Sequence, residues 1–230
     1  MTIMITDPLI ITSIQEGHVD ILSKALQENP ALAEADAKEG VSLLLFAAYC
    51  KNHPAVNLLK TYRTSLNIYE AVCTGEIEIV KALLDERPEE LNIPSPDGFS
   101  LLGYACFFNQ PAIARYLIVE KEADVNQPSA NAFKVTPLHS ACAIVSYPLT
   151  QLLLDNGANV NARQQGGVAP LHSAAHHGAT ELVRLLIESG ADINATTDAG
   201  ETALSFAEKS AFFNTAVYLR QEMFRTPNAG

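Results

Sequence analysis

The chain has 230 residues, of which 48% are hydrophobic and 18% are charged, so it can bury a sizeable core and lacks the composition of a disordered protein. Fifteen Lys and Arg residues against twenty-six Asp and Glu give a formal net charge of −11, and no basic cluster interrupts this negative field. Such a field repels phosphate backbones and anionic lipid surfaces, so we expect neither a nucleic-acid partner nor a membrane partner.

A pattern of two helices recurs along the chain, and a small residue in the first helix of each copy marks its position. In chain order these small residues are Ser13, Ala47, Ala71, Ala105, Ala141, Ala174 and Ala207. The last three are spaced by 33 residues, which is a period typical of repeat proteins. We therefore predict a single domain over residues 1–230, built from repeats at about 7–37, 38–61, 62–94, 95–127, 128–162, 163–195 and 196–225.

The step from the second copy to the third is short. Only 24 residues separate Ala47 from Ala71, and the segment KTYRTS runs directly into the next helix without the G-A-D-V-N stretch found elsewhere. We expect the β-hairpin that projects between successive copies, called a finger below, to be absent around Tyr62 to Leu66. The finger before the fifth copy has two extra residues, and Lys134 replaces its usual turn glycine, so we expect a longer finger of different shape there.

The fifth and sixth copies contain the segments VTPLHSACA and VAPLHSAAH, and the seventh contains ETALSFAEK. With the 33-residue period, these motifs resemble the ankyrin-repeat family. The resemblance implies an all-α fold, an ankyrin-repeat solenoid of about seven helix-turn-helix repeats with short β-hairpin fingers. The whole pattern also looks like that of small stand-alone bacterial ankyrin-repeat proteins.

Residues typical of helix starts and ends stand where the predicted helix pairs require them. Thr136 can cap a helix whose first position is Pro137, and glycines at 157 and 190 suit left-handed helix ends. In the last copy, Thr215 and Arg220 replace apolar residues of the sixth, which suits a polar terminal cap.

The sequence offers no clear set of catalytic parts, so we expect no enzyme, no organic cofactor and no metal. His139 and His172 stand at the TPLH position, where the resemblance implies a structural hydrogen bond between repeat loops. His176 and His177 are adjacent and diverge on a helix, and the four cysteines (Cys50, Cys73, Cys106 and Cys142) form no ligand motif. We expect these thiols to be reduced, as in a cytoplasmic protein.

Ankyrin repeats bind partner proteins through the concave face, formed by the finger tips and the ends of the first helices. Carried over by register, the expected protein-binding residues are Tyr49, Pro96, Asp97, Phe99, Phe107, Phe108, Phe133, Val135, Gln165, Val168, His176 and His177. Aromatic residues dominate interface hot spots, but the same side chains could instead pack beneath their own fingers or fill the space of the missing one. Exposure of the side chains distinguishes the two possibilities.

The function that these observations favour is a cytoplasmic protein–protein interaction module, a scaffold or regulator. A bacterial effector that binds host proteins is an alternative from a different class. An enzyme with an unrecognised site is the third, and it would require a pocket with perturbed titratable groups.

Overall fold

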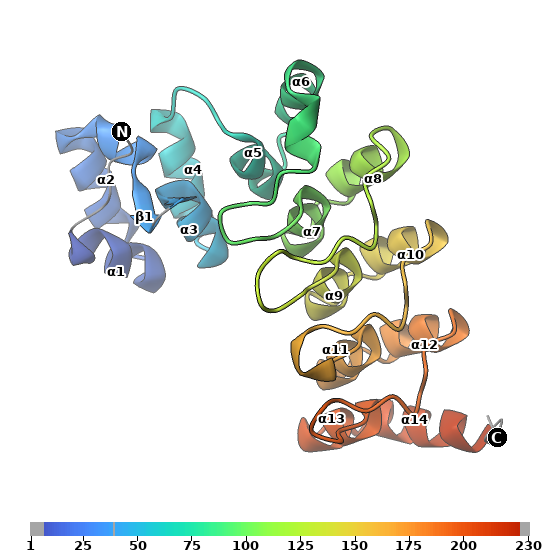
Figure 1. The fold of residues 1–230 in the computed structure, drawn as a ribbon. Helices are drawn as coiled ribbons and strands as arrows, with labels where there is room; N and C mark the ends of the chain where they lie inside the picture. Colours follow the sequence, from blue (N-terminus) through green and yellow to red (C-terminus); the bar gives the residue numbers. More distant parts are fainter. Residues whose placement is uncertain (1–6, 39, 226–230) are drawn as a thin grey trace. The chain divides into compact units, whose positions relative to one another are not determined.

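The computed structural model describes residues 7–38 and 40–225, in which fourteen α-helices and one small sheet form (Figure 1). The chain divides into two compact units. One contains the described residues up to Glu90 together with Ser95–Asp97, and the other contains Leu91–Pro94 and the described residues from Gly98 onward. The predominantly helical fold expected from the sequence is confirmed, whereas the single domain stays a prediction.

The first unit contains three helix pairs. Its elements are α1 (Pro8–Glu16), α2 (Val19–Glu28), η1 (Pro30–Glu34), β1 (Asp36–Lys38), β2 (Val41–Ser42), α3 (Leu43–Tyr49), α4 (His53–Tyr62), α5 (Ile68–Thr74) and α6 (Ile77–Glu86), followed by η2 (Pro88–Leu91). Strands β1 and β2 pair antiparallel, with Asp36 opposite Ser42.

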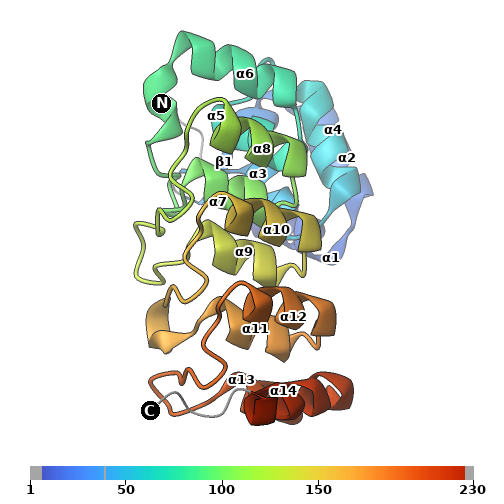
Figure 2. The same cartoon turned by 90° about the vertical axis from the view of Figure 1, so that its right-hand side faces the viewer.

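The second unit contains four helix pairs stacked on one another (Figure 2). Its elements are α7 (Leu101–Phe107), α8 (Pro111–Val119), α9 (Pro137–Ala143), α10 (Tyr147–Asp155), η3 (Gln165–Gly167), α11 (Pro170–His176), α12 (Thr180–Glu188), α13 (Ala203–Lys209) and α14 (Phe213–Arg225). The first helices of successive pairs pack side by side, as do the second helices.

The repeating small residue lies in the core of every pair. The six alanines of this set have no exposed surface, and Ser13 is only 1% exposed. A side chain of this size lets neighbouring helices approach closely, which is why the position tolerates little else. Ser42, Asn67, Ser100 and Thr202 cap the helices that follow them by accepting a backbone amide hydrogen bond.

The fingers differ from regular hairpins. Within the described part of the chain only β1 and β2 form strands, and an isolated bridge joins Thr196 to Thr202. Three later fingers share a backbone bond at equivalent positions, from Ser129 N to Val135 O (2.8 Å), from Gln164 N to Val168 O (3.0 Å) and from Thr197 N to Glu201 O (2.9 Å). Between α4 and α5, where every residue is described, the chain contains no strand, which confirms that the finger expected to be missing there is absent.

Each first helix is followed by a left-handed residue. Gly17, Gly75 and Gly178 suit this conformation, but in the other copies the position is taken by Lys51, Asn109, Val145 and Ala211, all with φ between 54° and 59°. A β-branched residue such as Val145 is strained there. The second helices of the fifth and sixth copies end at Gly157 and Gly190, whose φ values of 84° and 90° confirm the expected helix ends.

The last helix pair differs from the expected polar cap. Thr215 is 1% exposed and its hydroxyl lies 2.7 Å from that of Thr180, so it faces the preceding pair rather than solvent. It occupies the core position held by Leu182 one repeat earlier, and the partner hydroxyl satisfies its polar atom. Large apolar side chains are exposed on α14 instead, so the prediction of a polar end was wrong, although Arg220 is exposed.

Candidate protein-binding surface

The fingers of the second unit are joined tip to tip by backbone hydrogen bonds. Ala130 N donates to Gly98 O (2.6 Å), Gln165 N to Phe133 O (2.8 Å), and Asp198 N to Gly166 O (2.9 Å). We call this row of tips, residues 98, 130–135, 164–168 and 197–201, the finger ledge. Because each bond satisfies a donor and an acceptor of neighbouring fingers, the ledge presents its side chains from a fixed backbone.

Two glycines make this close stacking possible. A Cβ atom on Gly98 would lie 2.8 Å from the backbone nitrogen of Asn131, and one on Gly167 would lie 2.9 Å from that of Asp198. Both glycines also have positive φ, at 89° and 72°. Any side chain here would therefore strain the turn and push the next finger away.

Phe133 is the most prominent apolar side chain of the ledge, with 59% of its surface exposed. Its amide donates to the Asn131 side chain (3.0 Å) and its carbonyl accepts from Gln165, so its backbone is held at both ends. The next residue, Lys134, has φ 55°, a left-handed conformation that the glycine of other fingers adopts at lower energy. The side chains of Val135 and Val168 are half-buried, and that of Gln165 is exposed.

An aromatic cluster surrounds the end of α7. Tyr104 is buried, and the rings of Phe99 and Phe108 lie against it, with centroid distances of 6.1 Å and 5.4 Å. The ring of Phe107 packs edge-on against Phe108 at 5.1 Å and is 38% exposed. Part of each ring of Phe99 and Phe108 thus packs against Tyr104, whereas Phe107 is the outermost ring of the cluster.

His176 and His177 lie at the end of α11, and both are exposed. The Nδ1 atom of His176 lies 3.1 Å from the Ser210 hydroxyl, and its ring is 6.0 Å from that of Phe206 on the next pair. Partial burial, and secondarily the neighbouring His176, lower the pKa of His177. These side chains can donate and accept hydrogen bonds at the surface.

The remaining three expected binding residues lie in the first unit. The Tyr49 hydroxyl donates to a carboxylate oxygen of Asp97, and the Ser95 hydroxyl donates to the other at 2.6 Å. Pro96 packs so closely against Gly40 that a Cβ atom there would lie 2.6 Å from the proline Cβ. These contacts hold the 95–97 segment against α3 and the tip of the first finger. Part of the surface of Tyr49, Pro96 and Asp97 is therefore already in contact with the protein itself.

His139 and His172 connect one repeat to the next, as the resemblance implied. The Nε2 atom of His139 donates to Val168 O and that of His172 to Ala195 O, each at 3.0 Å. Because a carbonyl can only accept, the proton lies on Nε2 and Nδ1 accepts, from the Thr136 hydroxyl (2.8 Å) and the Ala169 amide (3.0 Å) respectively. Burial lowers the pKa of His139 to about 4 and also lowers that of His172, so both are neutral structural groups.

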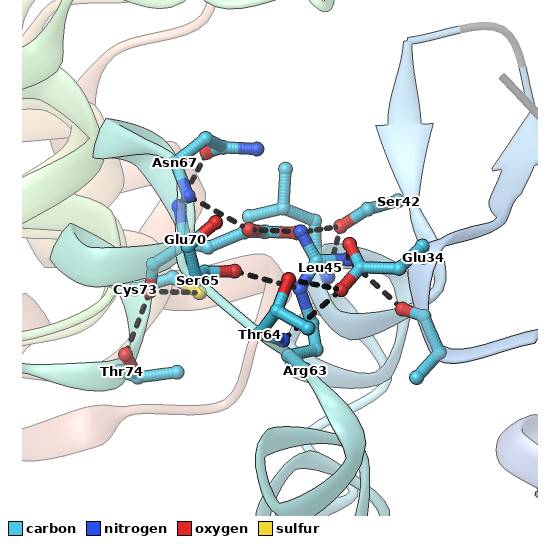
Figure 3. A network of polar contacts seen from close by, with 11 residues as sticks. Glu34, Ser42, Leu45, Arg63, Thr64, Ser65, Asn67, Glu70, Cys73 and Thr74 are labelled. Carbon is cyan, nitrogen blue, oxygen red and sulfur yellow. Dashed lines mark hydrogen bonds and ion pairs between the residues drawn. The ribbon is translucent and has the colours of Figure 1, made fainter. Parts of the chain in front are cut away.

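A buried ion pair in the first unit was not expected from the sequence. The Glu70 carboxylate, with no exposed surface, accepts from the Arg63 guanidinium (2.6 Å), the Ser42 hydroxyl (2.6 Å) and the Asn67 amide (3.0 Å), as Figure 3 shows. Arg63 lies in the short connection that replaces the missing finger, and it also donates to Ala33 O (2.9 Å). Counted from the helix cap, Glu70 holds the third position of α5, which His139 holds in α9.

The sequence carried two signals for this network. Asn67 and Glu70 form the N-x-x-E spacing of a capping box, and the structure contains that box. A glutamate within the apolar run Ile68–Cys73 also indicated a buried, paired carboxylate. With donors from Arg63, Ser42 and Asn67 around it, this carboxylate stabilises the connection, and its geometry does not indicate a reaction.

The four cysteines are present as thiols, and burial raises the pKa of each. Cys106 and Cys142 hold the same position in α7 and α9, and the proximity of Cys142 contributes to the raised pKa of Cys106. Such thiols are poor nucleophiles. Among residues 7–38 and 40–225, no three His, Cys, Asp or Glu side chains are grouped so as to hold a metal ion. In the same part of the chain, no helix has the length and apolarity needed to span a bilayer.

Several characterised proteins are similar to part of the chain. The BTB/POZ domain and ankyrin repeat-containing protein NPR3 of Oryza sativa subsp. japonica is 31% identical over 101 residues, which cover 44% of this chain and 16% of that protein. The ankyrin repeat and SAM domain-containing protein 6 of Rattus norvegicus is 31% identical over 105 residues, covering 44% and 11%. The regulatory protein NPR5 of Arabidopsis thaliana is 36% identical over 98 residues, covering 43% and 19%.

The matched regions thus span less than a fifth of each of these longer proteins, and the similarity concerns the repeats. A family model described as ankyrin repeats in three copies matches residues 61–129, 119–197 and 138–226, well over half of the chain. Together with the stacked helix pairs, the buried alanines and the histidine bonds between repeats, this match shows that the chain belongs to the ankyrin-repeat family.

Proposed function

We propose that the chain is a protein–protein interaction module that binds a partner through the finger ledge and the adjoining ends of the first helices. Ankyrin repeats are generally interaction modules, which supports the class of function. The proposed contact residues in the second unit are Phe99, Phe107, Phe108, Phe133, Val135, Gln165, Val168, His176 and His177. Tyr49, Pro96 and Asp97 form a separate proposed contact in the first unit.

The observation that carries this proposal is the exposure of Phe133 on a fixed backbone. A phenylalanine that is 59% exposed has no role in the core of its own repeat, yet the bonds to Asn131 and Gln165 hold its position. Binding through a side chain on a preorganised backbone loses little conformational entropy, which is the property of an interface anchor. Phe107 offers a second, smaller exposed ring.

The other parts of the proposal follow from charge and from thiol chemistry. A net charge of −11 supports a protein partner rather than a nucleic acid. Four cysteines present as thiols support a reducing compartment, and we propose the cytoplasm. The buried, neutral state of His139 and His172 supports a binding role without catalysis, because these histidines are committed to carbonyl groups.

The test compares captured partners among variants of the whole chain. Phe133→Ala and Phe107→Ala are immobilised beside the unchanged protein and exposed to an extract of the cells that produce it, and retained proteins are quantified by mass spectrometry. Loss of an anchor worth about 2 kcal/mol lowers affinity about 30-fold. We therefore expect a partner to be depleted by both variants.

Val119→Ala is the matched control, because Val119 is 58% exposed but lies on α8, the second helix of its pair. It should retain the same partner. The melting temperature separates binding from folding, since a buried phenylalanine would cost about 3–5 kcal/mol of stability when truncated. If Phe133→Ala retained the partner and Val119→Ala lost it, the site would lie on the second helices and the proposal would be overturned.

A further inference from the structure

The contacts between the last two helix pairs identify which positions of a second helix face the following pair. On α12, the Thr180 hydroxyl lies 2.7 Å from that of Thr215, and the Arg184 guanidinium lies 4.8 Å from the centre of the Tyr218 ring. Positions 180 and 184 are therefore directed toward α14. They are four residues apart and share one face of the helix.

The equivalent positions of α14, one 33-residue period later, are Phe213 and Val217. These side chains are 75% and 49% exposed, and Phe224, on the same face seven residues after Val217, is 85% exposed. We call Phe213, Val217 and Phe224 the terminal stripe. It continues the surface on which successive pairs stack, but with larger apolar groups than Thr180 and Arg184 provide.

The terminal stripe is large for an exposed apolar surface. A phenylalanine offers roughly 200 Å² of side-chain surface, so these exposures leave roughly 400 Å² uncovered on one helix. This area equals the largest apolar patches of typical monomeric proteins, and such patches usually mark interaction sites. Two copies of the stripe would remove roughly 800 Å² from water, below the 1,200–2,000 Å² of a standard interface, so any pairing through it is weak.

We propose that the terminal stripe is a self-association surface, at which α14 of one copy packs antiparallel against α14 of a second copy. The stripe carries a phenylalanine at each end, so a two-fold axis near Tyr218 places Phe213 of one copy against Phe224 of the other. A surface that already has the geometry of repeat stacking suits another helix pair of the same kind. The proposal is independent of the function proposed for the finger ledge.

The charges of α14 fit a second copy of an acidic chain. This helix contains two arginines and one glutamate, so two facing copies of α14 do not add to the repulsion expected between chains of net charge −11. Arg220 lies on the same face of α14, between Val217 and Phe224, and its guanidinium pairs with Glu208 of α13. In the proposed dimer its aliphatic stem covers Val217 of the other copy.

Sedimentation equilibrium of the whole chain tests the proposal. Over a wide micromolar range, the average mass should rise from 24.8 kDa toward twice that value. Phe213→Glu and Phe224→Lys should each weaken the dimer at least about tenfold, because each places an unpaired charge against a phenylalanine. Phe213→Glu adds an acidic residue to the first turn of α14, which is favourable for a helix, so the variant should keep its fold.

A mixture of the two variants tests the antiparallel arrangement. Between unlike copies, the carboxylate introduced by Phe213→Glu should face the ammonium group introduced by Phe224→Lys, and the two remaining phenylalanines should pair at the other end. The mixture should therefore dimerise while each variant alone does not. Val119→Glu, which places a negative charge on α8, should dimerise like the unchanged protein. A monomeric unchanged chain, an unaffected Phe213→Glu variant, or a mixture that stays monomeric would overturn the proposal.

Discussion

The ion pair between Arg63 and Glu70 should carry much of the stability of the short connection between α4 and α5. Arg63 is 8% exposed and Glu70 is fully buried. Substituting Arg63→Met keeps an unbranched aliphatic stem but removes the guanidinium, which leaves the carboxylate with only the Ser42 hydroxyl and the Asn67 amide. Removing one partner of a buried pair costs about 3–5 kcal/mol, because the remaining charge is uncompensated.

The net contribution of the ion pair to the free energy of unfolding is smaller than the loss caused by removing one partner. Removing both charges with Arg63→Met and Glu70→Gln leaves no buried ion, so the double variant should be destabilised by about 2 kcal/mol less than the sum of the single variants. The half-buried pair of Lys60 and Glu76 provides the control. Their side chains are 30% and 37% exposed, and Lys60→Met should cost at most about 1 kcal/mol.

Native-state hydrogen exchange is a suitable assay because repeat proteins open locally. Arg63→Met should accelerate exchange of the α3 and α5 amides by roughly two to four orders of magnitude, while the α9 and α11 amides change little. Acceleration below about fivefold, or single-variant effects that simply add, would refute the reasoning that Glu70 depends on Arg63.

Two further predictions concern the second unit. His139 has a pKa of about 4 when folded and 6.5 when unfolded, so its contribution to stability should be constant above pH 6.5 and fall by roughly 3 kcal/mol between pH 6.5 and pH 4; His139→Gln should remove this part of the loss in melting curves at pH 7 and pH 5. Val145 has φ 57°, so Val145→Gly should relieve strain and raise the melting temperature by about 2 °C. Gly178→Val, at the same position of the next repeat, should lower the melting temperature, since its Cβ would lie 2.2 Å from the Phe212 ring; a rise would contradict the argument.

Much of the fold could be predicted because the repeats carry local signals. The TPLH segments place Pro137 and Pro170 at the first helical positions, and the structure has both helices starting there. The absence of a finger before α5 followed from a spacing of 24 residues, since so short a segment leaves no room for two strands. These signals depend only on neighbouring residues, which a sequence displays directly.

Other features depend on where a side chain points, and the sequence does not display that. Thr215 suggested a polar outer face, but its position faces inward and Thr180 satisfies its hydroxyl. The aromatic residues of the expected site looked equivalent, yet Phe99 and Phe108 pack on Tyr104 while Phe133 projects. The partners of Glu70 include Ser42, which is 28 residues away in the chain, so this partner could not be assigned from spacing.

The bonds that join the finger tips also bear on how the chain folds. Each pairs residues 32 positions apart: 98 with 130, 133 with 165, and 166 with 198. Closing each of these loops therefore costs the same entropy, and no contact of the ledge requires distant parts of the chain to meet. Folding can begin in any repeat and spread to its neighbours, and the second unit should fold at the rate of a single repeat pair rather than slow with its length.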